Sequence, residues 1–129
     1  MDNGEVDGTV RSNREASLSP VWLVSRGNVL ASANLATSRR DRRRGLSGVA
    51  HVHTPLVLRP CNWVHSVGMR TTIDVAYVGP DGTVLHARQL RPMRVAPLVR
   101  GAAFVIEAAA GSFDRWSLRT GDQVEIREP

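Results

Sequence analysis

The sequence IDVAYVGPDGTVLHARQL, residues 73–90, predicts a β-hairpin. Residues Ile73–Val78 are mostly apolar, and their β-branched and aromatic side chains favour extended structure. The following Gly79-Pro80-Asp81-Gly82 combines the residues that are most typical of tight turns. Residues 83–90 then return as a second strand, so we expect the two strands to pair in the antiparallel direction.

Further elements follow on both sides of this hairpin. Residues 21–25 and 29–33 are strand-like and flank an Arg-Gly-Asn turn, which predicts another hairpin. A helix is predicted from Ser38 to Leu46, because Ser38 is a suitable cap and Asp41 stands three residues later. The remaining predicted elements are strands at residues 56–58, 104–109 and 123–127 and a helix at residues 111–118 with Ser112 as its cap. The expected fold is α+β: a small, mostly antiparallel, barrel-like β-sheet with two short helices.

The chain of 129 residues has the length of one domain. Residues 1–20 are rich in Gly, Asn, Asp, Glu and Ser without periodicity, so they are expected to form a disordered polar tail. Residues 21–129 are expected to form a single compact domain. No apolar run approaches the roughly 20 residues of a membrane span, and the first residues hold no apolar signal segment. We therefore expect no membrane span and a cytoplasmic location.

Arginine supplies all 17 basic residues of the chain. Residues 1–20 hold four acids and two arginines, a net charge of −2, whereas residues 21–129 hold eight acids and 15 arginines, a net charge of +7. Five of these arginines crowd the predicted helix between Arg39 and Arg44. They form either a solvated face or a patch for anions, and the second alternative predicts nonspecific polyanion or nucleic-acid contact.

The residues with chemical potential gather in RPCNWVHSVGMRTTIDVAYV, residues 59–78. Cys61, His65 and Met69 stand four residues apart and are ligand types of soft copper sites. In an extended strand, however, Cys61 and His65 would lie about 13 Å apart and share no ion. No metal and no other cofactor is therefore predicted.

Cys61 and His65 are also candidate catalytic residues, with the thiol as nucleophile and the imidazole as base. This alternative describes a cysteine- and histidine-dependent enzyme. A single cysteine in an apolar segment is more often a small buried hydrophobic residue. Both interpretations of Cys61 stay open at this point.

A third interpretation is a ligand pocket made by His65, Arg70 and Asp74, with Cys61 and Trp63 nearby. Asp74 falls within an apolar strand, so we expect it to be buried, and a buried carboxylate needs a partner. Arg70 and His65 are the expected partners. The same cluster is equally consistent with a polar network that holds the core together.

From Val24 to Ile126 the chain resembles the family called domain of unknown function 192. The resemblance rests on ordered blocks, which are Arg42-x-Arg44-Gly45-Leu46, Leu58-x-Pro60-Cys61-x-x-Val64-His65-Ser66-x-Gly68-Met69-Arg70-x-x-Ile73-Asp74-Val75, Asp81-Gly82, Arg91-Pro92, Gly101-Ala102, Val105-Ile106-Glu107, Ala110-Gly111 and Gly121-Asp122. It implies a compact α+β domain and no known activity, substrate or cofactor. Met69, Arg70 and Asp74 match positions of the family's motif.

Together these observations predict a small binding or accessory module. Its partner would be a small anionic or polar ligand held near His65, Arg70 and Asp74. The enzyme and the polyanion binder are the alternatives.

Overall fold

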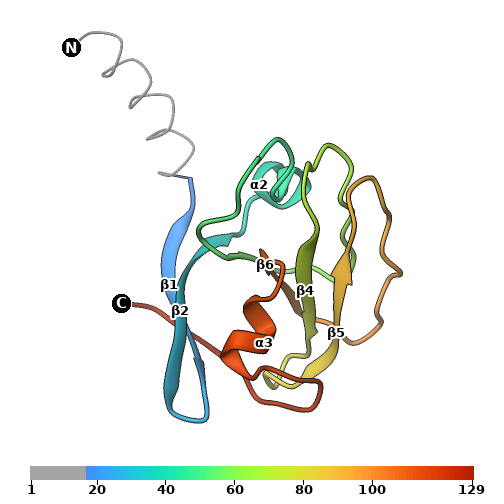
Figure 1. Cartoon of the computed structure of the whole chain (residues 1–129). Helices are drawn as coiled ribbons and strands as arrows, with labels where there is room; N and C mark the ends of the chain where they lie inside the picture. Colours follow the sequence, from blue (N-terminus) through green and yellow to red (C-terminus); the bar gives the residue numbers. More distant parts are fainter. Residues whose placement is uncertain (1–16) are drawn as a thin grey trace, which may run out of the picture.

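The computed structural model describes residues 17–129, which form a curled seven-stranded sheet and two short helices (Figure 1). The strands are β1 (Ser19–Ser25), β2 (Asn28–Ala36), β3 (Leu56–Leu58), β4 (Ile73–Val78), β5 (Val84–Leu90), β6 (Phe104–Ala109) and β7 (Glu125–Arg127). The helices are α2 (Arg39–Arg44) and α3 (Ser112–Trp116). The order across the sheet is β5-β4-β6-β3-β2-β1-β7, and only β2 and β3 pair in parallel. The expected α+β class with a mostly antiparallel sheet is confirmed.

The curl of the sheet brings its two edge strands together at one end, which makes a half-barrel. Thr83 and Gln123 form an isolated antiparallel bridge there, next to β5 and β7. Gly82 allows the close approach, since a Cβ at this position would stand 2.6 Å from the carbonyl oxygen of Val124. The expectation of a barrel-like sheet is thus met by partial closure.

Both expected hairpins are present. The β4–β5 turn closes through a hydrogen bond from Gly79 N–H to the Thr83 carbonyl at 2.9 Å. The β1–β2 hairpin is longer than predicted, because Ser19 and Pro20 still pair with Leu35 and Asn34. Pro20 is tolerated because β7 pairs only with Trp22 to Val24, so the missing N–H faces no neighbour. Of the expected tail, residues 1–16 lie outside the described residues.

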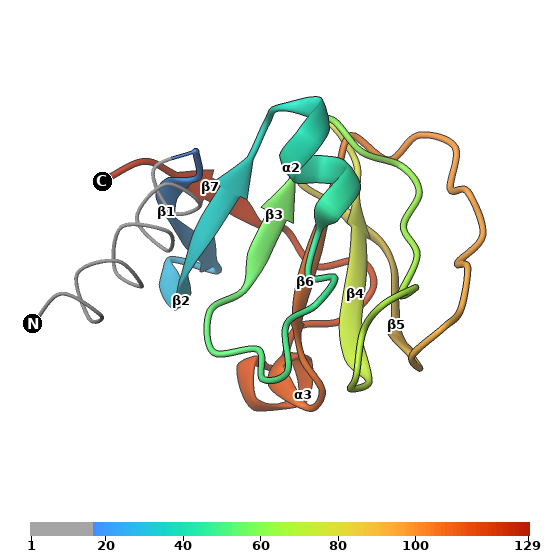
Figure 2. The same cartoon turned by 90° about the horizontal axis from the view of Figure 1, so that it is seen from above.

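Apolar side chains are buried on both faces of the sheet. One cluster fills the inside of the curl and includes Val57, Ile106, Phe113 and Val124. The other cluster includes Leu58, Val75 and Val105 and lies under α2 and the segment that follows β3. Figure 2 shows α2 near one end of strands β3 and β4 and α3 near the other. Neighbouring residues of β6 belong to different clusters, Ile106 to the first and Val105 to the second. Alternate residues of β6 therefore enter two different environments.

The two helices have different caps. Ser38 caps α2 as expected, since its Oγ accepts a hydrogen bond from Asp41 N–H at 3.1 Å. The prediction that Ser112 caps α3 is wrong, because Gly111 is the N-cap. Glycine has no side chain, so the N-cap residue makes no side-chain hydrogen bond to the helix. Instead, Phe113 N–H donates to the buried Asp74 carboxylate of β4 at 3.0 Å. Neither helix, nor any other within residues 17–129, is long and apolar enough to cross a membrane.

Two irregular segments, on either side of the β4–β5 hairpin, pair with each other. Ala96 N–H donates to the Val64 carbonyl at 3.0 Å, and His65 forms a bridge with Val95. The Tyr77 hydroxyl on β4 donates to the Pro97 carbonyl at 3.1 Å. These bonds fix the backbone of residues 61–66 at the edge of the second cluster, where it forms one wall of a pocket.

Candidate ligand-binding site

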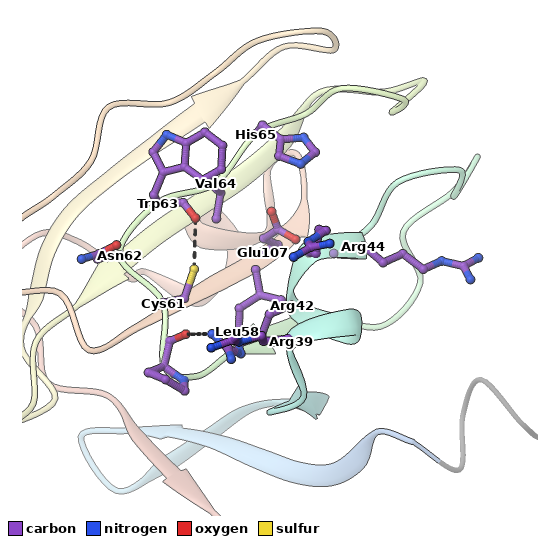
Figure 3. Close-up of a pocket in the computed structure, with 13 residues that line it drawn as sticks. Arg39, Arg42, Arg44, Leu58, Cys61, Asn62, Trp63, Val64, His65 and Glu107 are labelled. Atoms are coloured by element: carbon purple, nitrogen blue, oxygen red, sulfur yellow. Dashed lines mark hydrogen bonds between the residues drawn. The ribbon is translucent and has the colours of Figure 1, made fainter.

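A pocket of about 320 Å³ lies between α2 and the segment that follows β3, above β6 (Figure 3). This volume is at the small end of the usual range for ligand sites. Its lining residues are Arg39, Arg42, Arg43, Arg44, Gly45, Leu58, Pro60, Cys61, Asn62, Trp63, Val64, His65 and Glu107. The pocket thus brings together three parts of the chain that are distant in sequence.

Helix α2 forms the basic wall of this pocket. Four of its five arginines border the pocket, and only Arg40 does not. Arg42 is half-buried and holds the helix in place, because its guanidinium donates to the Pro60 carbonyl at 2.9 Å and to the Thr37 carbonyl at 3.1 Å. Arg39 and Arg43 are exposed, so their charges reach the solvent at the pocket rim.

Trp63 and His65 form part of the opposite wall. Their rings are 5.7 Å apart between centroids and tilted by 55°. His65 Nδ1 accepts a hydrogen bond from Val67 N–H at 3.1 Å, so in the neutral ring the proton is on Nε2. The imidazole therefore offers a donor rather than a base on its second nitrogen.

Cys61 lies in the same wall with a partly buried thiol. Its Sγ donates to the Trp63 carbonyl at 3.1 Å, as the dashed line in Figure 3 shows. Burial raises the pKa of the thiol, and the hydrogen bond to Trp63 and the nearby Arg42 only partly oppose this. Within residues 17–129 no hydrogen bond joins Cys61 to His65. The structure therefore places both catalytic candidates in one pocket without the nucleophile–base contact that activates a thiol.

Glu107 is the functional candidate that the sequence analysis missed. It is only 2% exposed, and its carboxyl points into the space between α2 and the wall of Cys61 to His65 (Figure 3). Within the described part of the chain, its Oε1 has no hydrogen-bond partner. Burial raises the pKa of Glu107 to about 8. The sequence signal was available, because Glu107 is the only charged residue in the apolar strand Phe104–Ala109.

Arg70 and Asp74 lie apart from this pocket. Asp74 is 3% exposed, as expected, but its hydrogen bond comes from the Phe113 backbone on the other side of the sheet. Arg70 is exposed, and no ion pair within residues 17–129 joins it to Asp74. Of the five residues expected to bind a ligand, the structure brings together Cys61, Trp63 and His65.

Comparison with known protein families confirms the resemblance that the sequence motifs indicate. The model of an uncharacterised family, domain of unknown function 192 or "Uncharacterized ACR", matches residues 13–126. No curated protein shows significant similarity to the chain.

Two solved structures are similar in fold. A protein of unknown function from Novosphingobium aromaticivorans DSM 12444 has a TM-score of 0.68 and 19% identity, over 84% of each chain. A protein proposed to be a transcription regulator, from Sinorhizobium meliloti 1021, has a TM-score of 0.61 and 18% identity, over 84% of this chain and 93% of its own. At these identities the likeness concerns the fold alone.

Proposed function

The chain belongs to the domain of unknown function 192 family, an uncharacterised family, and we propose from the chemistry of its pocket that it is a small binding module for an anionic ligand. The pocket lies between α2 and residues 60–65. The ligand would be a small molecule that carries at least one oxyanion group, since the pocket is small and its rim is cationic.

One observation carries this proposal: four arginines of a six-residue helix border a single concavity. Charges of one sign that line a hollow surface concentrate the opposite charge there. Guanidinium groups also match the geometry of carboxylate and phosphate oxygens. Cys61, Trp63 and His65 are proposed as the facing wall, with the indole as apolar surface and His65 Nε2–H as a further donor.

Arg70 and Asp74 are not ligand-binding residues in this proposal, because neither borders the pocket. Asp74 holds the first turn of α3, and Arg70 contributes only to the positive field of the domain. The cytoplasmic location remains a prediction.

The test is binding of sulfate and succinate at low salt, measured by isothermal titration calorimetry. The test variant is R39Q/R43Q, which removes two rim charges while leaving the Arg42 hydrogen bonds intact. The matched control is R40Q, which changes an exposed arginine of the same helix that does not border the pocket. We expect R39Q/R43Q to bind the anion at least about tenfold more weakly, because Arg39 and Arg43 border the pocket and would lie close to the bound charge. We expect R40Q to bind it nearly as the native protein does, because Arg40 does not border the pocket and solvent ions screen its charge from the ligand. Equal binding by all three proteins, or none by the native protein, would contradict the proposal.

A second candidate function is nonspecific polyanion contact through α2. It is favoured by the exposure of Arg39, Arg40, Arg43 and Arg44 on one short helix. A single-stranded oligonucleotide would then bind with an affinity that falls steeply with salt. In this case R40Q would weaken binding as much as R39Q, whereas a pocket ligand distinguishes the two positions.

A further inference from the structure

We propose that Glu107 is the ligand-binding group at the base of this pocket, and that it donates a hydrogen bond, as a neutral carboxylic acid, to an oxygen of the bound anion. This inference rests on the proposed function and specifies the ligand contact that the arginines do not make. It assigns a role to a buried carboxyl oxygen, Oε1, that has no hydrogen-bond partner among the described residues.

The first argument is the geometry around the carboxyl. A buried carboxyl oxygen without a hydrogen-bond partner is unfavourable, so folded proteins seldom retain one without a reason. Oε1 itself is enclosed beside Gly45, and the Glu107 side chain to which it belongs is part of the pocket lining. Gly45 leaves room for the carboxyl, because a Cβ at that position would stand 3.2 Å from Oε1.

The second argument is the set of groups that face Glu107. Its paired neighbours on β3 and β4 are Leu56 and Val75, which carry no charge. The titratable and charged groups on the surrounding elements are Arg39, Asp41, Arg42, Arg43 and Arg44 of α2, Cys61 and His65 of the facing wall, and Tyr77 of β4. No ion pair within residues 17–129 joins any of these arginines to Glu107.

Burial therefore dominates the ionisation of Glu107, and its raised pKa of about 8 leaves it mostly protonated at neutral pH. A protonated carboxyl is a hydrogen-bond donor, as it must be to face an anion without repulsion. A cationic ligand would find a negative charge here only after Glu107 lost its proton, and it would have to pass four arginines. The rim and the base of the pocket are thus complementary to the same ligand, an oxyanion.

The experiment measures sulfate binding by calorimetry at several pH values from about 6.5 to about 9.5, over which sulfate itself does not titrate. We expect the affinity of the native protein to fall about tenfold for each pH unit above 8, because only the protonated form of Glu107 donates. The isosteric variant E107Q keeps a donor at every pH, so its affinity should stay nearly constant over the range. Any decrease that persists in E107Q reports ionisation of another pocket group, Cys61 or His65, which both proteins retain.

The outcomes separate the two proposals. If sulfate binds but E107Q and the native protein share one pH profile, Glu107 is not the donor and the binding module stands. An affinity that increases above pH 8 also overturns the inference, since it would mean that the ionised carboxylate is the binding form. If sulfate does not bind the native protein at about pH 6.5, the proposed function itself fails. Carboxyl carbon NMR of the native protein at neutral pH tests the protonation of Glu107 even if E107Q does not fold.

Discussion

Gly45 lies so close to Glu107 that a Cβ on residue 45 would stand 3.2 Å from Oε1 of the glutamate. The same glycine ends α2 with φ +51° and ψ −128°, a conformation that L-residues rarely adopt. One residue thus terminates the arginine-bearing helix and leaves space for the buried carboxyl. A side chain at position 45 would therefore disturb both the end of α2 and the position of the Glu107 carboxyl.

We expect G45A to lower the free energy of unfolding by about 1–3 kcal/mol, because alanine at this φ and ψ is strained. It should also weaken sulfate binding, since the methyl group displaces the Glu107 carboxyl. Urea denaturation and calorimetry measure the two effects. The control is G48A, which also has a positive φ, +81°, but has no atom within 4 Å of the added Cβ. G48A should lose stability without losing affinity, and equal affinities of the two variants would contradict the role given to Gly45.

The buried Glu107 also predicts a pH dependence of stability. Its pKa is about 8 in the folded protein and 4.5 in its ordinary state, so the folded state holds the proton more tightly. Burial of the Glu107 carboxyl therefore does not lower the free energy of unfolding through ionisation below pH 4.5. The loss in free energy of unfolding grows as the pH rises from 4.5 to 8 and is constant above pH 8. Relative to the native protein, E107Q should gain on the order of 5 kcal/mol in free energy of unfolding between these two pH values. Denaturant titrations of both proteins at each pH would check this, and a difference that does not change with pH would contradict it.

The parts of the fold that were predicted correctly depend on local sequence. The β4–β5 turn is set by Gly79 to Gly82, and the start of α2 by Ser38, so both could be found from neighbouring residues alone. The cap of α3 could not, because Asp74 stands 39 residues before the N–H that it accepts from. The buried Asp74 carboxylate needs a hydrogen-bond donor, and the first turn of α3 supplies one through the Phe113 N–H.

The candidate site was predicted only in part, for a similar reason. Cys61, Trp63 and His65 are close in sequence, so the chain keeps them close in space. Glu107 joins them only through the order of β3 and β6 in the sheet, which the sequence pattern does not determine. The rule that a lone acid in an apolar strand is buried identified Asp74, and the same rule applies to Glu107.

Cys61 offers a test of the enzyme alternative. Because burial raises the pKa of its thiol, little thiolate should form at neutral pH. Iodoacetamide should therefore label Cys61 in the folded protein more slowly than in the urea-unfolded protein, with a rate that increases only at alkaline pH. Mass spectrometry of the alkylated chain measures both rates. Rapid labelling of the folded protein below about pH 8 would contradict this expectation and revive a catalytic role for the thiol.

Replacement of Asp74 tests whether this residue of the predicted cluster of His65, Arg70 and Asp74 stabilises the fold or binds a ligand. In D74A the Phe113 N–H loses its acceptor inside the protein, which should lower the free energy of unfolding by about 1–3 kcal/mol. The control is D114A, which removes an exposed acid from the first turn of the same helix and should have a smaller effect. Sulfate affinity should be unchanged in both variants, since neither residue borders the pocket of Arg39 and Glu107. A loss of affinity in D74A at a temperature where it remains folded would instead show that Asp74 acts on the ligand, as the sequence had suggested.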